Sequence, residues 1–591
     1  MPAKSNSTSQ TQGNNSGSFS LDDGSRIAVI GGGPAGSFFS YFILQVASRS
    51  GMHLVVDIYE RRDFATFGPT GCNMCGGVVN ESLVQALSVE GIDLPPEVVQ
   101  RGIDSFFFHS EKESVALYAP FHQMRIATVY RGAGPRGANG LKWRSFDGYL
   151  LELATKSGAN LIGERVTDLV MNEGRPRVET KDGLSQPYDL VVGAIGVNTP
   201  SLELFEKLGT GYERPATRKT CNLEFKLGSS FITGRLGNSM HAFLLDLPKL
   251  DFAAIIPKGD YVTMCLIGDK ITNDFVDSFV RNPVVSTYLS DSGEHDAAAC
   301  RCAPLASLGN AVRPFGDRVV LLGDCGMARL NKDGIGSAYR VAKVAAITAL
   351  FRGVSAGDFG KGYWPVCRTI VADNRYGRLI FKVVDVIKKS RLLTRAVMRM
   401  AREEQRKAGR QRWMSMVLWD MFTGSSPYRE VFMRCLHPAF WGRLLGHIGA
   451  SMLPSRGPVS EPVRGQEDNM DTSSLGRDYR TGDVIVREGE IGDCMYVILS
   501  GQAEVMRSTD GEDVRLAVLG KGDIVGEMSI FQKERRSATV RALTDMRIMT
   551  VDRKIFLKRV HEDPSFVFPI LQKMSQRIRD LNAELAQLKS G

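Results

Sequence analysis

The chain has 591 residues, of which 43% are hydrophobic and 24% are charged. This composition excludes wholesale disorder, a collagen helix and a coiled-coil rod, and the length suffices for about three or four domains. Its 10 cysteines are too dilute for a secreted disulfide scaffold, and neither a secretory signal nor a long apolar run is visible. We therefore expect a soluble, multidomain protein of the cytoplasm.

The residue pattern divides the chain into five segments. Residues 1–25 have the composition of a disordered tail, and a strand-like apolar run opens an α/β region over 26–350. A basic helical region over 351–453 is followed by a proline-rich and acidic linker over 454–474. Residues 475–591 contain short strands separated by glycine turns, then a helix, which is typical of an all-β roll.

A glycine motif, G-x-G-x-x-G, stands between a strand and a helix at the start of the α/β region. Its glycines permit a tight turn, the close approach of a pyrophosphate, and close packing of helix on strand. The second strand ends in an acid 24 residues after the last glycine, where a carboxylate can bind a ribose hydroxyl. This context favours a dinucleotide site over an ordinary βαβ unit. The predicted contacts are Gly31, Gly33, Pro34, Ala35, Gly36, Glu60 and Arg61.

A second glycine-rich segment, RVVLLGDCGMARLNKDGIGSAYR, ends the α/β region. With the segment RSFDGYL and the strand YDLVVGAIG, it resembles the flavoprotein family of geranylgeranyl reductases, flavin halogenases and aromatic-ring hydroxylases. The resemblance spans about residues 26–340 and implies FAD-binding Rossmann-type architecture. In that family the GD aspartate binds the ribityl chain, an arginine lies near the cofactor, and the helix start faces the flavin pyrimidine. The residues implied here are Arg144, Asp324, Gly334, Ile335 and Gly336.

The segment GCNMCGGVV narrows the resemblance to the geranylgeranyl reductases, whose C-G-G segment lies close to the flavin. One CxxC pair, Cys72 and Cys75, cannot complete a tetrahedral metal site without further ligands, so we predict no metal. Cys75 is the candidate catalytic thiol, as a proton donor or redox partner. The alternative is that Cys75 only packs, while Gly76 and Gly77 make room for the cofactor.

Two departures from the family pattern bear on the chemistry. Ile195 stands where the hydroxylases carry an aspartate, which argues against a hydroxylase-type use of NADPH. In the segment DFAAIIPKG, Ala253 and Ile255 replace large aromatic residues that line the reductases' substrate channel. A substrate that is not a prenyl lipid therefore stays open.

The positive charge of the chain is concentrated in one stretch. Residues 375–412 hold 13 basic and 3 acidic residues, an excess larger than the net charge of +9 of the whole chain. Trp413, Trp419 and Trp441 lie in or just beyond the helical segment 379–422, which overlaps this stretch. Basic residues beside Trp, Leu and Met are typical of helices on a membrane surface, and a solvated helical cap is the alternative. No nucleic-acid-reading module accompanies the charge.

The C-terminal segment resembles the cyclic nucleotide-binding domain. The stretches GEMSIF and RSATV match its phosphate-binding cassette. The arginine and the helix start of this cassette bind the cyclic phosphate, and its glutamate accepts a hydrogen bond from the ribose 2′-hydroxyl. The serine after the arginine can donate to a phosphate or to a guanine, so cAMP and cGMP both stay open. The implied contacts are Gly526, Glu527, Met528, Ser529, Arg536 and Ser537.

The final helix carries an apolar heptad seam, which predicts a homodimer; a lone intramolecular helix is the alternative. The seam is Leu571, Met574, Ile578, Leu581, Leu585 and Leu588. The transcription factors with this domain carry a helix-turn-helix after such a helix, and this sequence shows none before Gly591, so we expect no DNA binding.

These features together predict an FAD-dependent oxidoreductase that reduces carbon–carbon double bonds of a hydrophobic, prenyl-lipid-like substrate under cyclic nucleotide control. A halogenase- or hydroxylase-like monooxygenase is the first alternative. A non-catalytic sensor of redox state and cyclic nucleotide is the second. We expect a cytoplasmic location, with peripheral contact at the inner face of the membrane.

Overall fold

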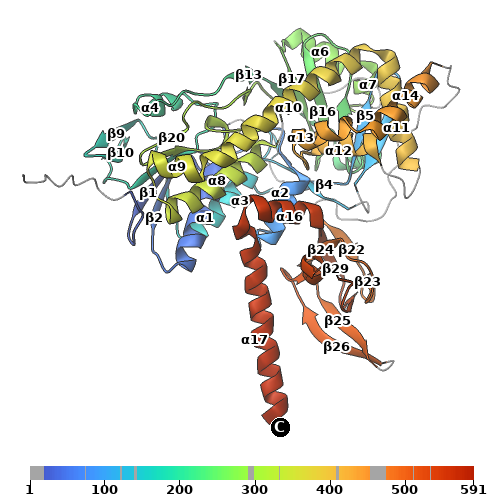
Figure 1. Cartoon of the computed structure of the whole chain (residues 1–591). Coiled ribbons are helices and arrows are strands. Elements are labelled where there is room, and N and C mark those ends of the chain that lie inside the picture. Colours follow the sequence, from blue (N-terminus) through green and yellow to red (C-terminus); the bar gives the residue numbers. More distant parts are fainter. Residues whose placement is uncertain are drawn as a thin grey trace, which may run out of the picture.

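The computed structural model describes residues 19–590 except 69, 73–74, 120–122, 139–142, 270, 291–297, 332, 407–411, 453–473, 510–511 and 533. Most of the predicted tail (1–25) and linker (454–474) therefore lies outside the described residues. Figure 1 shows a large body of sheets and helices with a small β-roll beneath it. One long helix, α17 (Phe568–Ser590), extends away from both. The predicted fold class, α/β with a helical extension and an all-β C-terminal roll, is confirmed.

A six-stranded sheet is the base of the large body. Its strands are β1 (Arg26–Ile30), β2 (Val55–Tyr59), β8 (Asn160–Ile162), β12 (Leu190–Gly193), β20 (Phe315–Gly316) and β21 (Val319–Leu321). Their order is β20-β21-β12-β1-β2-β8. All neighbours run parallel except β20 and β21. Parallel strands need crossover connections, and helices provide them here.

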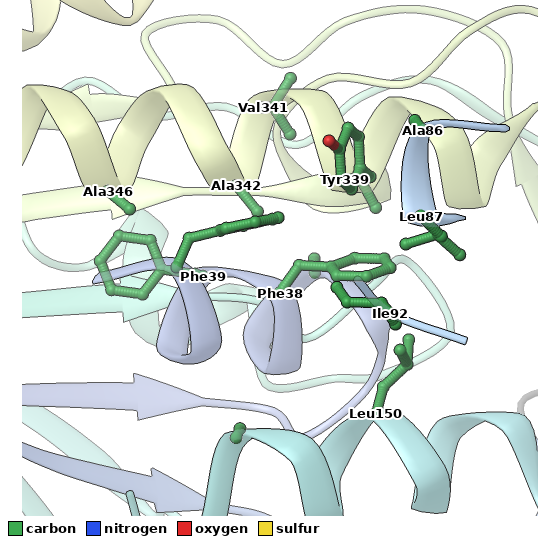
Figure 2. Packing of buried hydrophobic residues seen from close by; sticks show 14 of the residues in the cluster. Phe38, Phe39, Ala86, Leu87, Ile92, Leu150, Tyr339, Val341, Ala342 and Ala346 are labelled. Carbon is green, nitrogen blue, oxygen red and sulfur yellow. The ribbon is translucent and has the colours of Figure 1, made fainter. Parts of the chain in front are cut away.

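Helices α1 (Pro34–Arg49), α3 (Phe146–Lys156) and α8 (Gly334–Phe351) pack around this sheet. Phe38 and Phe39 of α1 are buried against α8, where Ala342 and Ala346 leave room for the rings (Figure 2). The Phe38 ring meets the edge of Tyr339 at a centroid distance of 5.4 Å. Close packing of α1 on α8 brings their N-termini to one side of the sheet.

A second, mostly antiparallel sheet has seven strands in the order β18-β14-β17-β16-β15-β5-β6. These are β5 (Ser105–His109), β6 (Ser114–Tyr118), β14 (Cys221–Lys226), β15 (Ser239–Phe243), β16 (Leu250–Lys258), β17 (Tyr261–Gly268) and β18 (Cys300–Cys302). Smaller sheets comprise β3 (Val78–Val79), β4 (Val99–Ile103) and β7 (Ile126–Val129); β9 (Asp168–Asn172), β10 (Arg175–Thr180) and β11 (Gly183–Leu184); β13 (Thr217–Lys219) and β19 (Leu305–Ser307). The remaining short helices are α2 (Glu81–Val89), α4 (Leu202–Glu206), α5 (Ser229–Arg235), α6 (Asn273–Val280), α7 (Pro283–Ser286) and η2 (Gly323–Cys325).

Within the described residues, six helices form the extension. They are α9 (Ala356–Gly362), α10 (Trp364–Lys389), α11 (Arg391–Arg406), α12 (Trp413–Thr423), α13 (Tyr428–Cys435) and α14 (Pro438–Ser451). Trp413 and Trp419 are buried in the core between these helices and the second sheet. These two tryptophans, which the sequence suggested for a membrane surface, are therefore covered by protein, whereas Trp441 is exposed. No helix within the described residues is long and apolar enough to cross a membrane.

The roll consists of two four-stranded sheets, β22-β29-β24-β27 and β23-β28-β25-β26. Its strands are β22 (Arg477–Tyr479), β23 (Val484–Val486), β24 (Cys494–Ser500), β25 (Ala503–Thr509), β26 (Glu512–Leu519), β27 (Ile524–Val525), β28 (Thr539–Ala542) and β29 (Met546–Asp552). Its helices are α15 (Glu527–Gln532), α16 (Arg553–Glu562), η3 (Pro564–Val567) and α17. Met495, Val551 and Phe566 belong to the same buried cluster as Leu87 of α2, so the roll and the large body share one hydrophobic core.

Candidate functional site

One cavity of about 680 Å³ lies where the first sheet, the second sheet and α12 meet, a volume typical of ligand sites. Its polar end is the turn between β1 and α1. Gly31 has a φ of +106°, and a Cβ added there would lie 2.5 Å from the carbonyl oxygen of Ala194. Gly33 precedes α1 with no side-chain cap, so the first amides of α1 stay available to an anion.

Glu60, at the end of β2, orders this turn. One carboxylate oxygen accepts hydrogen bonds from the backbone of Gly32 (2.9 Å) and the other from Arg62 (2.8 Å). Glu60 and Arg61 line the cavity together with Gly31, Gly33, Pro34 and Ala35. Gly36 does not line it; instead Gly36 allows α1 to pack against Gly31 and Val29. The predicted glycine cradle and its acid are thus brought together around one space.

Asp324, Gly334 and Ile335 reach the same cavity from the other side. Burial raises the pKa of the Asp324 carboxyl, and the Arg131 guanidinium opposes that rise. Gly336 does not line the cavity, and its missing side chain leaves space for the Asp333 carboxylate.

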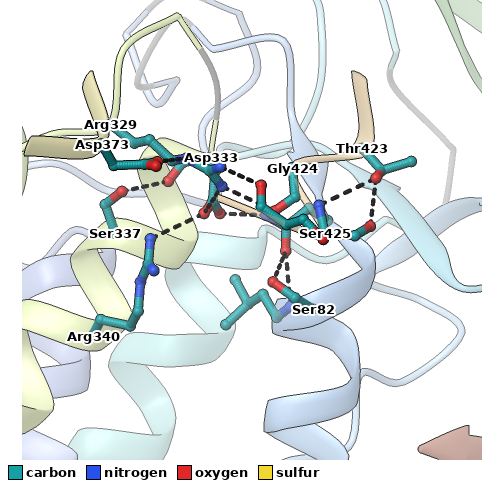
Figure 3. A network of polar contacts seen from close by, with 12 residues as sticks. Ser82, Arg329, Asp333, Ser337, Arg340, Asp373, Thr423, Gly424 and Ser425 are labelled. Carbon is teal, nitrogen blue, oxygen red and sulfur yellow. Dashed lines mark hydrogen bonds and ion pairs between the residues drawn. The ribbon is translucent and has the colours of Figure 1, made fainter. Parts of the chain in front are cut away.

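Asp333 is the centre of a polar network at the start of α8 (Figure 3). It adopts the left-handed region with a φ of +59°, which is uncommon for a residue other than glycine. Its carboxylate accepts hydrogen bonds from Asn80, Arg329 and Arg340. Arg329 also donates to the carbonyl oxygen of Gly424 after α12, at 2.9 Å. The network joins α2, α8 and α12 at the edge of the cavity.

Arg144 does not line this cavity. Its guanidinium pairs with Glu152 and Glu97 and stacks over Tyr149, outside the cavity lining. Arg131 lines the cavity in its place. Asp147, from the same segment as Arg144, is fully buried and holds Arg131 through two hydrogen bonds of 2.8 Å. Sequence reasoning missed Arg131 because its segment, RGAGPRG, resembles a simple loop.

Three thiols line the cavity: Cys72, Cys75 and Cys265. The Cys75 sulfur accepts a hydrogen bond from the backbone of Gly77 at 3.4 Å. Cys265 of β17 faces Gly76, where an added Cβ would lie 2.9 Å from its sulfur. Burial raises the pKa of Cys265 far above that of a free thiol, so this thiol stays protonated at neutral pH.

A buried cation lies behind this wall. Lys258 at the end of β16 is fully buried, with its ammonium 4.6 Å from the centre of the Tyr130 ring and 4.0 Å from Glu224. Thr263 donates to Glu224 at 2.8 Å. Burial raises the pKa of Glu224, and Lys258 opposes that rise. The ammonium lies directly against Gly77 of the cavity wall.

The other end of the cavity is apolar. Successive side chains of a strand point to opposite faces, so Phe252, Ala254 and Ile256 of β16 face the cavity. Ala253 and Ile255 are buried in the core on the opposite face. Ala253 and Ile255, the positions that the resemblance placed in the substrate channel, are therefore each one residue away from the positions that face the cavity. The apolar lining is completed by Phe106, Met240, Ile267 and Phe422.

A second candidate site lies in the roll. Gly526 has a φ of +79°, and Glu527 and Arg536 are both buried beside it. Arg536 donates to the carbonyl oxygens of Gly526 (2.9 Å) and Cys494 (2.7 Å). Glu527 pairs with Arg577 of α17 at 3.3 Å. The structure thus brings together the two charged residues that the cassette pattern predicted.

The other predicted cassette residues lie at the rim. The Met528 and Ser537 side chains are exposed. Ser529 belongs to α15, and its side chain lies outside the described residues.

A buried ionic network connects the roll to the large body. Arg125 pairs with Glu81 of α2 at 2.9 Å and with Asp552 of the roll at 2.7 Å. Glu81 also accepts hydrogen bonds from Trp419 (3.0 Å) and Ser425 (2.7 Å). Burial raises the pKa of Asp552, and Arg125 opposes that rise. Nothing in the local sequence marks Arg125 or Glu81 for this role, because their partners Asp552 and Trp419 lie hundreds of residues away.

Comparison with known proteins identifies the roll. Residues 476–563 match the family model of the cyclic nucleotide-binding domain. The CRP-like cAMP-activated global transcriptional regulator of Mycobacterium tuberculosis is 31% identical over 112 residues, 19% of this chain and 50% of that protein. The cAMP-dependent protein kinase regulatory subunit of Schizosaccharomyces pombe is 37% identical over 78 residues, 13% of this chain and 18% of that protein. The match thus spans half the length of the first relative and less of the second.

The large body resembles solved flavin enzymes at a lower level. The halogenase PltM has a TM-score of 0.46 and 13% identity, over 72% of this chain and 92% of that chain. An aklavinone-11 hydroxylase, solved with FAD and aklavinone, has a TM-score of 0.45 and 16% identity, over 60% and 69% of the two chains. TM-scores below 0.5 do not establish a common fold. What is established is that the chain joins a cyclic nucleotide-binding domain, over 476–563, to an α/β body with a cavity of its own.

Proposed function

We propose that the large body is an FAD-dependent oxidoreductase acting on a hydrophobic substrate, and that cyclic nucleotide bound to the roll regulates it. One observation carries the first part: a glycine cradle and an apolar chamber are two ends of the same cavity. The cradle suits a dinucleotide because its wall requires glycine: a Cβ added at Gly31 would clash with the carbonyl oxygen of Ala194, and one at Gly77 with that of Val129. The chamber suits an apolar molecule.

The residues around the cavity would have two roles, binding the cofactor and enclosing the substrate. The amides after Gly33 and the carboxylate of Asp324 would hold the cofactor, while Phe252, Ile256 and Phe422 exclude water from the substrate. Bound and reduced, FAD supplies a hydride. Reduction of a carbon–carbon double bond also needs a proton on the second carbon. The Cys75 thiol is our candidate proton donor, reprotonated from water.

The test uses purified full-length protein loaded with FAD, reduced under anaerobic conditions and mixed with a polyprenyl lipid. A product heavier by two hydrogens supports the reductase. A product that gains one oxygen atom when air is admitted, with no reduction, would establish the monooxygenase alternative instead. A protein that retains FAD but catalyses neither of these two reactions would be a sensor.

Regulation is proposed from two contacts that join the roll to the walls of the cavity. Asp552 reaches α2 through Arg125 and Glu81. Asp563, between α16 and η3, pairs with Lys343 of α8 at 2.7 Å, and α8 begins at the cavity. A shift of α16 or η3 on ligand binding would therefore act on both helices.

Coupling of this kind requires that the nucleotide bind one arrangement better than another, and typical couplings are about 1–3 kcal/mol. Turnover with and without saturating cAMP or cGMP measures the effect. Arg536→Ala removes the main partner of the cyclic phosphate and should abolish the response while FAD stays bound. A variant that responds like the wild type would contradict the assignment of the cassette.

A further inference from the structure

Helix α10 presents an unusual outer face. It has 26 residues, a length of about 39 Å, and runs along the outside of the large body (Figure 1). Its inner face is anchored by buried residues such as Cys367, Ile370 and Ile380. Its outer face carries Leu379, Val383 and Val386, which are 43%, 51% and 59% exposed. Their spacing of four and three residues places them in one row, which we call the α10 ridge.

Packing within the chain does not explain this ridge. Two of its residues are β-branched, and valine is a weaker helix former than the alanine, lysine or glutamate common at exposed positions. Single exposed apolar residues are ordinary on protein surfaces, whereas an exposed apolar row that also lies beside exposed bases is typical of contact with another molecule.

The ridge is flanked by exposed bases. Arg375, Arg378, Lys382 and Lys389 lie on the same outer side of α10. The acid nearest to them, Asp385, is already paired with Lys389 at 2.7 Å. Among the described residues, no acidic oxygen lies within 4.0 Å of the charged groups of Arg375 or Lys382. The face therefore presents net positive charge along one side of an apolar row.

We propose that the outer face of α10 binds the surface of an anionic lipid membrane. The ridge would enter the boundary between headgroups and acyl chains, and the flanking bases would contact lipid phosphates. Nucleic acid would satisfy the bases but would leave the three apolar side chains against phosphate or water. An exposed, convex helix also offers no groove for a partner peptide. An anionic bilayer matches both features at once.

The surface lies apart from another exposed apolar face. Trp441 and Leu445 of α14 and Met452 just after it are exposed as well, but the exposed positions between them are glycines, and this face lacks the row of bases. This second face is an alternative membrane-binding surface, and variants of the two faces distinguish them in the experiment.

The test is sedimentation of the full-length protein with lipid vesicles, which needs neither bound FAD nor turnover. Failure here would therefore leave the proposed enzymatic function untouched. Wild-type protein should bind vesicles of phosphatidylcholine with about one third phosphatidylglycerol, bind pure phosphatidylcholine weakly, and dissociate in about 0.5 M salt. Replacing two bases in Arg378→Gln/Lys382→Gln should weaken binding about 10- to 30-fold. Leu379→Ser/Val383→Ser/Val386→Ser should weaken it by a similar factor.

A matched control is available in the roll. Val514, Leu516 and Val518 form an equally long exposed row on β26, each 47% exposed. Their triple serine variant should bind vesicles like the wild type, and circular dichroism should show all variants folded. The proposal is overturned if wild-type protein ignores anionic vesicles, or if either α10 variant binds like the wild type. It is also overturned if Trp441→Ser/Leu445→Ser alone abolishes binding, or if duplex DNA competes with vesicles and binds the ridge variant unchanged.

Discussion

Replacing Arg577 in α17 should increase the affinity of the roll for cyclic nucleotide. The Glu527 carboxylate must accept a hydrogen bond from the ribose, yet it is paired with Arg577 at 3.3 Å. Arg577, whose Nη2 also donates to the carbonyl oxygen of Ile524 at 2.6 Å, therefore competes with the ribose for this carboxylate. Arg577→Ala removes that competition before the ligand arrives.

The size of the effect follows from the exposure of the pair. The Arg577 and Glu527 side chains are 30% and 10% exposed, so solvent screens the pair in part and its contribution is about 0.5–1 kcal/mol. The dissociation constant for cAMP should accordingly fall about two- to fivefold. The loss of one positive charge near an anionic ligand acts in the opposite direction, so the sign of the change is informative.

Isothermal titration calorimetry of the full-length protein measures this change. Lys573→Ala is the matched control, because Lys573 lies one turn earlier in α17 and pairs with Asp523 rather than with the cassette glutamate. Its affinity should equal that of the wild type. Weaker binding by Arg577→Ala would refute the reasoning, since it would show that Arg577 attracts the ligand instead of competing with it.

Four further predictions concern the cavity, the core and the last helix. Gly33→Val should prevent FAD uptake in reconstitution while the protein stays folded, because Gly33 lines the cradle and its φ of −70° admits a side chain without backbone strain; a variant that still takes up FAD would contradict the cradle. Cys75→Ala should keep the flavin spectrum and lower the rate of substrate reduction. An unchanged rate would show that Cys75 only packs and donates no proton. Burial lowers the pKa of His241 to about 3. Below about pH 6.5 the unfolded chain therefore binds a proton at this imidazole that the folded chain does not bind. This difference should lower the free energy of unfolding by up to about 1.4 kcal/mol per pH unit between pH 6.5 and pH 3. His241→Phe should flatten this slope in thermal melts, and an identical slope would contradict the assignment. Leu581→Glu should convert a dimer to a monomer in sedimentation experiments, because Leu571, Ile578, Leu581 and Leu585 are all exposed on α17; wild-type protein that is monomeric at all concentrations would exclude the dimer.

The sequence alone determined the features that depend on local backbone chemistry. The glycine turn of β1–α1 and the αL glycine of the cassette were predictable because only glycine tolerates the required φ or approach. The change from helical to strand periodicity predicted the C-terminal roll. The placement of Glu527 and Arg536 beside Gly526 followed from one compact motif, whose two ends lie nine residues apart.

Only the tertiary structure decided which side chains share a surface. Arg131, and not Arg144, lines the cavity because the buried Asp147 carboxylate pairs with Arg131 and holds it there. The faces of β16 depend on register, and an error of one residue exchanges cavity and core. Trp419 is covered because Glu81 of α2 accepts its N–H, whereas the α10 ridge is exposed because no element packs on it among the described residues. Burial and long-range pairing are properties of the folded chain, and no local pattern of residues encodes them.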